Sequence, residues 1–216
     1  MALTLSPEET RILGCLIEKE RTTPDQYPLS LHSATTACNQ STNRDPVVSY
    51  TEPMVALGMD DLRGKKLVTQ SWGAGSRVQK YRHNLLDVFE LNPREVALLC
   101  VLLLRGPQTL GELRIRTERM HAFASIAEVE ETLQGLALMS EPLVRLLPHR
   151  PGQKEQRYVQ LLSGEPALEQ LSSPESHPAA APTPTRVETL EAEVAALKAE
   201  VATLKEEFAR FRQQLG

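Results

Sequence analysis

The sequence repeats itself at an offset of 86 residues, and this repeat constrains the fold more than any other feature. The stretch LSPEETRILGCLIEKERTT, which begins at Leu5, matches LNPREVALLCVLLLRGPQT, which begins at Leu91. Self-similarity at a fixed offset indicates that one supersecondary unit is used more than once. We therefore expect two units that are built alike within the 216 residues.

Both copies begin with residues that start a helix. Ser6 or Asn92 serves as the N-cap, a proline follows it, and Glu9 or Glu95 stands three residues after the cap, as a capping box requires. Behind each cap, apolar residues recur with the spacing of a helix that buries one face. They are Ile12, Leu13, Leu16 and Ile17 in the first copy and Leu98, Leu99, Leu102 and Leu103 in the second.

The two copies also end alike, in a predicted β-hairpin. Each final segment begins with Leu-Val, passes through a glycine-containing turn and returns through a strand with Tyr81 or Tyr158. Between the first helix and the hairpin, each copy has room for two more helices. Three helices followed by a hairpin is the layout of a winged helix-turn-helix domain. The expected helices lie near residues 29–40 and 51–65, and near 109–119 and 125–139.

The predicted fold is therefore mainly α with small β-hairpins, in the form of tandem winged helix-turn-helix domains followed by a C-terminal coiled coil. The first winged-helix domain covers residues 3–88 and the second covers residues 89–164. Residues 165–185 contain five prolines and few residues that could fill a core, so we interpret them as a Pro-rich linker.

Residues 186–215 carry apolar side chains at 3-4 spacing over four heptads, which predicts a coiled coil. Valine at the first a positions and leucine at the matching d positions favour two parallel strands. In a parallel pair the facing g and e residues are oppositely charged, from Arg186 with Glu191 to Glu207 with Arg212. A single amphipathic helix packed on its own domain predicts no such match, so we predict a parallel homodimer. The dimerisation residues are Val187, Leu190, Val194, Leu197, Val201, Leu204, Phe208 and Phe211.

Five motifs occur in order along the chain: TTPDQYPLSL, ACNQSTNRDPV, GSRVQKY, LLLRGPQTLGELRIR and RYVQLLSGE. With them the chain resembles the YceH-like family of uncharacterised bacterial proteins from about Leu3 to Glu165. The resemblance implies a tandem winged-helix fold, a similar C-terminal coiled coil and a bacterial cytosolic setting. It implies no particular activity, substrate or catalytic residue. The chain departs from the family where Ser33, Thr35 and Thr36 stand on a helix face that is more apolar in the family.

The polar segment TTACNQSTNRDPVVSY, residues 35–50, is either a site or an elaborate turn. Cys38 has no nearby partner that would complete a metal set, and no base that would activate its thiol. Asn43 and Asp45 favour a turn, because their side chains bond the local backbone. We interpret the segment as a turn that ties the second helix to the third, with a ligand or nucleic-acid contact as the alternative. The residues suited to this tie are Asn39, Gln40 and Arg44.

Basic residues gather in the two predicted hairpins and in the second helix of the second copy. Lysine and arginine supply most phosphate contacts in DNA-binding proteins, so these residues are candidate nucleic-acid contacts. A solvated hairpin surface and an acidic protein partner are the alternatives. The candidates are Lys65, Lys66, Arg77, Lys80, Arg82, Arg114, Arg116, Arg150, Lys154 and Arg157.

The predicted third helices are acidic, which argues against the reading of DNA bases. A carboxylate that faces phosphate is repelled, and only cytosine offers it a good partner in the major groove. These helices therefore favour a protein partner. Their acidic residues are Glu52, Asp60 and Asp61 in the first copy and Glu128, Glu130 and Glu131 in the second.

We predict a cytoplasmic, non-enzymatic protein that holds no cofactor and no metal. The three cysteines and five histidines lack metal or disulfide spacing, and the longest apolar run, residues 96–104, is about half of a membrane span. The first hypothesis is a homodimeric DNA-binding or transcription-regulatory protein that contacts phosphates through its wings. The alternative is a protein–protein adaptor that uses its acidic third helices and does not bind DNA. The expected partners are a second copy of the chain and either double-stranded DNA or another protein, with no membrane.

Overall fold

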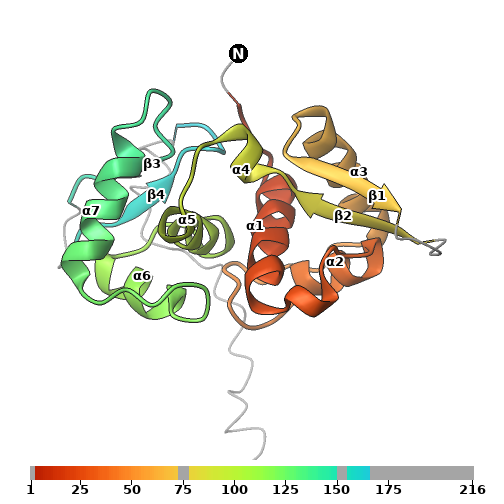
Figure 1. The fold of residues 1–216 in the computed structure, drawn as a ribbon, viewed down its shortest axis with the longest axis horizontal. Coiled ribbons are helices and arrows are strands. Elements are labelled where there is room, and N and C mark those ends of the chain that lie inside the picture. The colour runs from red at the N-terminus through yellow and green to blue at the C-terminus, as the bar shows by residue number, and fades with distance from the viewer. Residues whose placement is uncertain (1–2, 73–77, 150–154, 166–216) are drawn as a thin grey trace, which may run out of the picture. The chain divides into compact units, whose positions relative to one another are not determined.

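The computed structural model describes residues 3–72, 78–149 and 155–165. Within these ranges the protein is mainly helical, with seven α-helices and two small antiparallel strand pairs (Figure 1). The two predicted hairpin turns, most of the predicted linker and the predicted coiled coil lie outside the described residues.

The first half of the described chain, residues 3–88, has the predicted order of three helices and a hairpin, with a 3₁₀ turn after α1 and a short helix at its end. The helices that we expected near residues 29–40 and 51–65 are confirmed. Its elements are α1 (Pro7–Thr22), η1 (Pro24–Gln26), α2 (Leu31–Cys38), α3 (Glu52–Gly64), β1 (Val68–Trp72), β2 (Gln79–His83) and α4 (Leu85–Val88).

The second half, residues 89–165, repeats this order with shorter strands, and the helices expected near residues 109–119 and 125–139 are confirmed. The predicted tyrosines Tyr81 and Tyr158 both lie in the returning strand of their hairpin. Its elements are α5 (Pro93–Arg105), α6 (Leu110–Thr117), α7 (Ile126–Ala137), β3 (Val144–Leu146) and β4 (Tyr158–Gln160).

The first helix of each half starts with the capping box that the sequence predicts. The Ser6 hydroxyl accepts a hydrogen bond from the Glu9 backbone amide at 3.2 Å, and the Glu9 carboxylate accepts one from the Ser6 amide at 2.6 Å. Asn92 and Glu95 make the same exchange at 3.2 and 2.8 Å. Each box satisfies two amides that the first turn of a helix otherwise leaves unpaired.

The helices α1 and α5, which the repeat equates, pack against each other in the middle of the described chain (Figure 1). Gly14 allows the close approach, because a Cβ atom there would lie 2.8 Å from Leu104 Cδ2 and 3.2 Å from Leu103 Cβ. The Cys100 thiol donates to the Gly14 carbonyl at 3.4 Å. Gly14 and Cys100 hold the same position in the repeat, so equivalent sites of the two halves meet each other.

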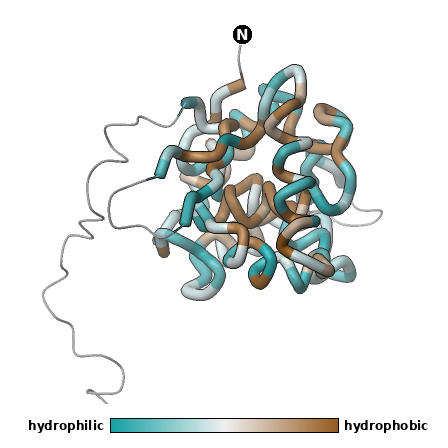
Figure 2. Tube along the Cα trace, turned by 90° about the vertical axis from the view of Figure 1, so that its left-hand side faces the viewer, coloured by the Kyte–Doolittle hydropathy of each residue, from teal (hydrophilic) through white to brown (hydrophobic). Residues whose placement is uncertain are grey.

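The burial of α5 corrects the expectation that only one face of this helix is covered. Every residue from Val96 to Leu104 is buried. The physical reason is that α5 contacts α1, α6, α7 and β4 and therefore has neighbours all round. Hydrophobic positions are accordingly concentrated along the inner segments of the described chain (Figure 2). None of the described helices is both long and apolar enough to cross a bilayer.

In each half, an isolated β-bridge joins the returning strand of the hairpin to the segment just before the second helix of that half. Leu29 pairs with Tyr81 in the first half, and Gln108 pairs with Tyr158 in the second. These bridges fix which residues of the two halves are equivalent in space, because α2 begins two residues after Leu29 and α6 begins two residues after Gln108.

Candidate interaction surfaces

Of the ten candidate phosphate contacts, seven lie within the described residues, and Lys65 is the first that has a partner inside the protein. Its ammonium group lies 2.5 Å from Oε1 and 2.6 Å from Oε2 of Glu9, and it also donates to the Thr4 carbonyl at 2.8 Å. The Glu9 side chain is almost fully buried. Lys65 therefore neutralises a buried carboxylate of the fold, and its role as a phosphate contact stays a prediction.

Three arginines of the second half are also engaged within the protein. Arg157 binds the Glu112 carboxylate at 2.9 Å, and Arg116 lies 3.4 Å from the same carboxylate. Arg114 donates to the carbonyls of the loop between α6 and α7, at 3.4 Å. The structure thus assigns Arg114, Arg116 and Arg157 to holding α6, its following loop and β4 together.

The remaining described candidates, Lys66, Lys80 and Arg82, lie on or next to the first hairpin. Their side chains make no ion pair within the described part of the chain. Lys80 stands opposite Ser71 and Arg82 opposite Thr69 in the strand register, so both project from the face of the hairpin that turns away from the core. Cations and hydroxyl groups therefore share this face. We call these three residues the hairpin cations.

Three further candidates, Arg77, Arg150 and Lys154, lie outside the described residues, as do all the predicted dimerisation residues from Val187 to Phe211. Their roles stay predictions.

The outward face of α3 is apolar and acidic. Met54 and Leu57 are 39% and 68% exposed, although apolar side chains of this size usually gain from burial. Asp61, one turn beyond Leu57 on the same face, is exposed and has no ion pair within the described residues. Arg63 is the basic residue of α3, and its partner is Asp60 at 2.7 Å.

The acidic residues of α7 fall into two groups. Glu128, which the sequence suggests as an exposed carboxylate, accepts a hydrogen bond from the Ala124 amide at 2.8 Å and pairs with Arg94 at 3.0 Å. Glu130 and Glu131 are exposed and have no ion pair among the described residues. Glu128 therefore stabilises the start of α7, whereas the other two carboxylates remain available to a partner.

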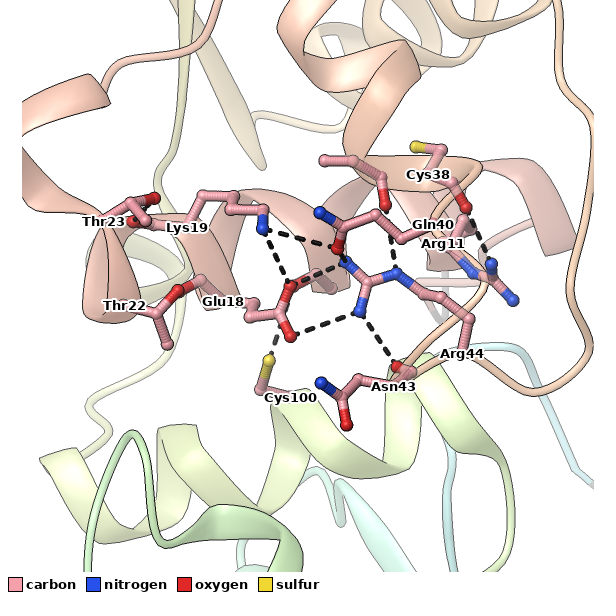
Figure 3. A network of polar contacts seen from close by, with 12 residues as sticks. Arg11, Glu18, Lys19, Thr22, Thr23, Cys38, Gln40, Asn43, Arg44 and Cys100 are labelled. Atoms are coloured by element: carbon pink, nitrogen blue, oxygen red, sulfur yellow. Dashed lines mark hydrogen bonds and ion pairs between the residues drawn. The ribbon is translucent and has the colours of Figure 1, made fainter.

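The polar segment before α3 contains a buried ion pair that joins it to α1 (Figure 3). The Arg44 guanidinium donates to both carboxylate oxygens of Glu18, at 3.2 and 2.6 Å. Its other hydrogen bonds reach the Ala37 carbonyl at 3.1 Å, the Asn43 carbonyl at 2.9 Å and the Gln40 side chain at 3.0 Å. Five donors thus meet five acceptors, which satisfies the whole guanidinium group.

Asn39 fixes the far end of the same segment. Its side-chain amide donates to the Tyr50 carbonyl at 2.8 Å, and its side-chain oxygen accepts from the Tyr50 amide at 2.7 Å. Arg11 of α1 donates to the Cys38 carbonyl at 2.9 Å. These contacts support the interpretation of residues 35–50 as a turn that ties α2 to α3, because the side chains of Asn39 and Arg44 are hydrogen-bonded within the fold.

The Cys38 thiol is fully buried. A hydrogen bond with Cys15 and burial together raise the pKa of Cys38 well above its usual range, and burial does the same for the pKa of Cys100. A thiol with a raised pKa stays protonated and is a poor nucleophile. Within the described ranges, no group of three or more His, Cys, Asp and Glu side chains is placed to hold a metal ion.

Sequence reasoning missed the partners of the basic residues and the role of Glu18. Lys65 and Glu9 are 56 positions apart, and Arg44 and Glu18 are 26 positions apart, so local spacing gives no signal for either pair. It also missed a cavity in the second half that borders Gly111 and Ile126. The sequence does carry a signal at this place. When the helices of the two halves are aligned at their N-caps, Gly111 takes the position of His32 and Ile126 takes the position of Glu52, so two polar residues of the first half have apolar counterparts in the second.

These features define a mainly helical protein whose two similarly ordered halves share a core and expose an apolar, acidic helix and a basic hairpin. Residues 5–153 match the family described as "Protein of unknown function, DUF480", and the chain belongs to this family. The expected membership in a family of bacterial proteins is thereby confirmed, while the YceH-like name stays a resemblance.

Three relatives illustrate how much of the chain the family covers. The chain is 50% identical over 218 residues to a UPF0502 protein of Geobacter sulfurreducens, with 99% of both chains aligned. It is 49% identical over 195 residues to a UPF0502 protein of Citrifermentans bemidjiense, covering 90% of each chain. A UPF0502 protein of Shewanella piezotolerans is 45% identical over 203 residues, which cover 89% of this chain and 93% of the relative.

Proposed function

We propose that each half is a winged helix-turn-helix unit and that the protein acts by binding another protein through the exposed face of α3. The order of three helices and an antiparallel hairpin in each half supports the winged-helix assignment. One observation carries the function: Met54 and Leu57 are exposed beside the carboxylate of Asp61, which has no ion pair with any described residue. A helix that reads DNA would present Arg, Lys, Asn or Gln at such positions.

The chemistry of this face selects the kind of partner. Exposed apolar side chains on a soluble protein mark an interaction site when they lie together, and interface cores are poor in charge. A partner surface with apolar residues flanked by lysine or arginine would bury Met54 and Leu57 and pair with Asp61. We therefore expect a basic, partly apolar protein segment as the partner.

The test is capture of the partner with Leu57→Asp and its matched control Leu138→Asp. Leu138 is 84% exposed and lies just beyond α7, so the same substitution there changes charge and apolarity away from α3. Full-length wild-type protein and both variants are cross-linked in cell extract, and the captured proteins are quantified by mass spectrometry. We expect a protein retained by the wild type and by Leu138→Asp to be absent with Leu57→Asp. Equal capture by both variants would contradict the α3 site.

A second candidate function, DNA binding, is favoured by the hairpin cations. Lys66, Lys80 and Arg82 lack carboxylate partners within the described residues, and the hydroxyl-bearing residues Thr69 and Ser71 stand opposite Arg82 and Lys80 in the strand register. Such a face can hold phosphates without reading bases, which is how a wing contacts the DNA backbone. The acidic face of α3 opposes a deeper contact, since it would bring carboxylates towards the phosphates.

Binding to random-sequence duplex DNA, followed by fluorescence anisotropy over a salt series, separates the two functions. DNA binding through the hairpin predicts that Lys66→Ala/Lys80→Ala/Arg82→Ala weakens affinity and lowers the slope of log K against log salt by about one for each phosphate that the variant no longer binds. Leu57→Asp should leave that slope unchanged. If the wild type shows no binding at low salt, DNA binding is rejected and the α3 function stands alone.

The homodimer is part of the same proposal. The heptad pattern of residues 186–215 supports a parallel pair of chains. Such a dimer would present two α3 faces, one from each chain, and would raise the avidity for a partner that carries two binding segments. The cytoplasmic location and the absence of enzymatic activity remain expectations from the sequence.

A further inference from the structure

A cavity of about 350 Å³ opens in the second half between α6, α7 and the β3–β4 hairpin. This volume falls within the range of about 300 to 1,000 Å³ that is common for small-molecule sites. The cavity belongs neither to the α3 face nor to the hairpin cations. Its walls are formed by Leu110, Gly111, Ile126, Glu130, Leu146, Glu155, Gln156 and Tyr158.

The hydroxyl group of Tyr158 borders this cavity without a hydrogen-bond partner in the described part of the chain. The residue as a whole is only 5% exposed, yet its hydroxyl oxygen is not among the buried side-chain atoms that lack a partner, so solvent or a ligand can reach it. Tyr81 holds the equivalent strand position in the first half, and its hydroxyl donates to the Gln79 side chain at 3.3 Å. Tyr158 therefore presents a polar group that the fold itself leaves unused.

In the first half, the equivalent positions carry a hydrogen-bonded polar pair that is exposed to solvent. The second residue of α2, His32, binds the first residue of α3, Glu52, at 2.8 Å. The second residue of α6 is Gly111, which has no side chain, and the first residue of α7 is Ile126, which cannot pair. Gly111 and Ile126 thus leave the wall of the cavity without the polar pair that the first half carries at the equivalent positions.

The charge of the rim selects the ligand. Glu130 and Glu155 have no ion pair within the described residues, and both border the cavity. Burial raises the pKa of Tyr158, and the negative charge of Glu130, which lines the same cavity, adds to this effect. Anionic ligands would be repelled by two carboxylates, whereas a cation would be attracted and would find apolar walls for its hydrocarbon part.

We propose that this cavity binds a small organic cation, in which an ammonium or guanidinium group is carried on a short aliphatic chain. The cationic group donates hydrogen bonds to the carboxylates of Glu130 and Glu155 and to the oxygen of the Tyr158 hydroxyl. The aliphatic chain contacts Leu110, Ile126 and Leu146, which line the cavity. This site does not depend on α3, so either assignment can fail without the other.

The probe is n-pentylamine, with 1-pentanol as a neutral compound of the same chain length. Full-length ¹⁵N-labelled protein is titrated with each, and amide chemical shifts are followed by NMR. We expect saturable shifts at Gly111, Ile126 and Leu146 with millimolar affinity for the amine, and binding of the alcohol that is at least ten-fold weaker. The cation site is overturned if the amine gives no saturable shift at these residues, or if the alcohol binds equally well.

Two substitutions test the place of binding. Gly111→Leu fills the cavity, and the added Cβ would meet only the Thr109 hydroxyl, 4.0 Å away, so the helix tolerates it. We expect at least a ten-fold loss of amine affinity, while the control Gly64→Leu, where no atom lies within 4 Å of the added Cβ, binds as the wild type does. Glu130→Gln should weaken the amine several-fold and leave the alcohol unchanged. Unaltered amine binding by Gly111→Leu would place the ligand elsewhere and refute the assignment.

A third ligand distinguishes the source of the cation. N-acetyl-lysine methylamide carries a similar aminoalkyl chain on a peptide backbone. Weaker binding than n-pentylamine identifies a free amine as the natural ligand, and tighter binding identifies a lysine side chain of a protein. Both results support a cation site, whereas failure of all amines to shift the cavity residues rejects it.

Discussion

At the scale of single residues, removing one partner of the buried Glu18–Arg44 pair is expected to destabilise the protein strongly. The side chain of Arg44 is fully buried and that of Glu18 is 8% exposed, so neither charge is screened by water. Removing both charges from water is costly, and the five hydrogen bonds of the guanidinium offset that cost only while they are complete. The pair therefore specifies where the turn before α3 sits on α1 more than it adds net stability.

Arg44→Ala should lower the free energy of unfolding by about 3 kcal/mol, because it leaves the buried Glu18 carboxylate with only the longer contact to the Lys19 ammonium group, 3.7 Å away. Urea unfolding followed by circular dichroism measures the change. The control is Arg63→Ala, which breaks the exposed pair with Asp60 and should cost at most about 1 kcal/mol. Similar losses in the two variants would show that Glu18 is not isolated from water.

Glu20 gives the protein a contribution to stability that depends on pH. Its carboxylate lies 2.9 Å from the His83 ring, and this hydrogen bond lowers the pKa of Glu20, with help from the charges of His83, Arg21 and Arg82 and against the effect of burial. A carboxyl group whose pKa is lowered by folding stabilises the protein above its unfolded pKa, about 4.3. That contribution is lost as the pH falls through the lowered pKa.

We therefore expect the melting temperature of the wild type to fall more steeply below about pH 4.5 than that of Glu20→Gln, since the variant has no carboxyl group there to protonate. Thermal unfolding from pH 3 to pH 7 measures both curves. Parallel curves would mean that Glu20 has the same pKa in the folded and unfolded chain.

At the scale of elements, the sequence predicts what depends on neighbours in the chain. The caps of α1 and α5 need only residues three positions apart, and the helix and strand positions follow from periodicity and turn residues. The complete burial of α5 was not predictable in this way, because it depends on four elements that surround the helix. The same holds for the surface: which lysine or arginine is available depends on carboxylates far away along the chain, such as Glu9 for Lys65.

The packing of α1 on α5 should be sensitive to the size of residue 14. Gly14→Leu would force atoms into Leu103 and Leu104, and overpacking of this kind typically costs about 1–3 kcal/mol. Chemical denaturation compares it with Gly64→Leu, where the space is open and no comparable destabilisation is expected. A Gly14→Leu protein as stable as the control would show that the two helices can separate at no cost in stability.

At the scale of the whole molecule, the heptads of residues 186–215 predict the number of chains in solution. Val194→Asp/Val201→Asp places carboxylates at two positions of the predicted seam and should convert a dimer into a monomer. Light scattering coupled to size-exclusion chromatography measures the mass, which we expect to fall from about twice the chain mass of 24.0 kDa to that of one chain. An unchanged mass would reject the coiled-coil dimer.

The meeting of Gly14 with Cys100, two equivalent positions of the repeat, makes the described chain an intramolecular pseudo-dimer. In a true dimer of identical subunits every substitution appears twice, on both sides of the symmetry axis. Fusion into one chain removes this coupling, so each side of the interface can change by itself. Gly14 and Cys100 are one example of such a difference: the glycine lets α5 approach α1 closely, and the cysteine stands at the equivalent position of α5. The His32–Glu52 pair and its counterpart, Gly111 with Ile126, are another. The repeat supplies a common scaffold, and the differences between its two copies leave the second half with the cavity in which we place the organic cation.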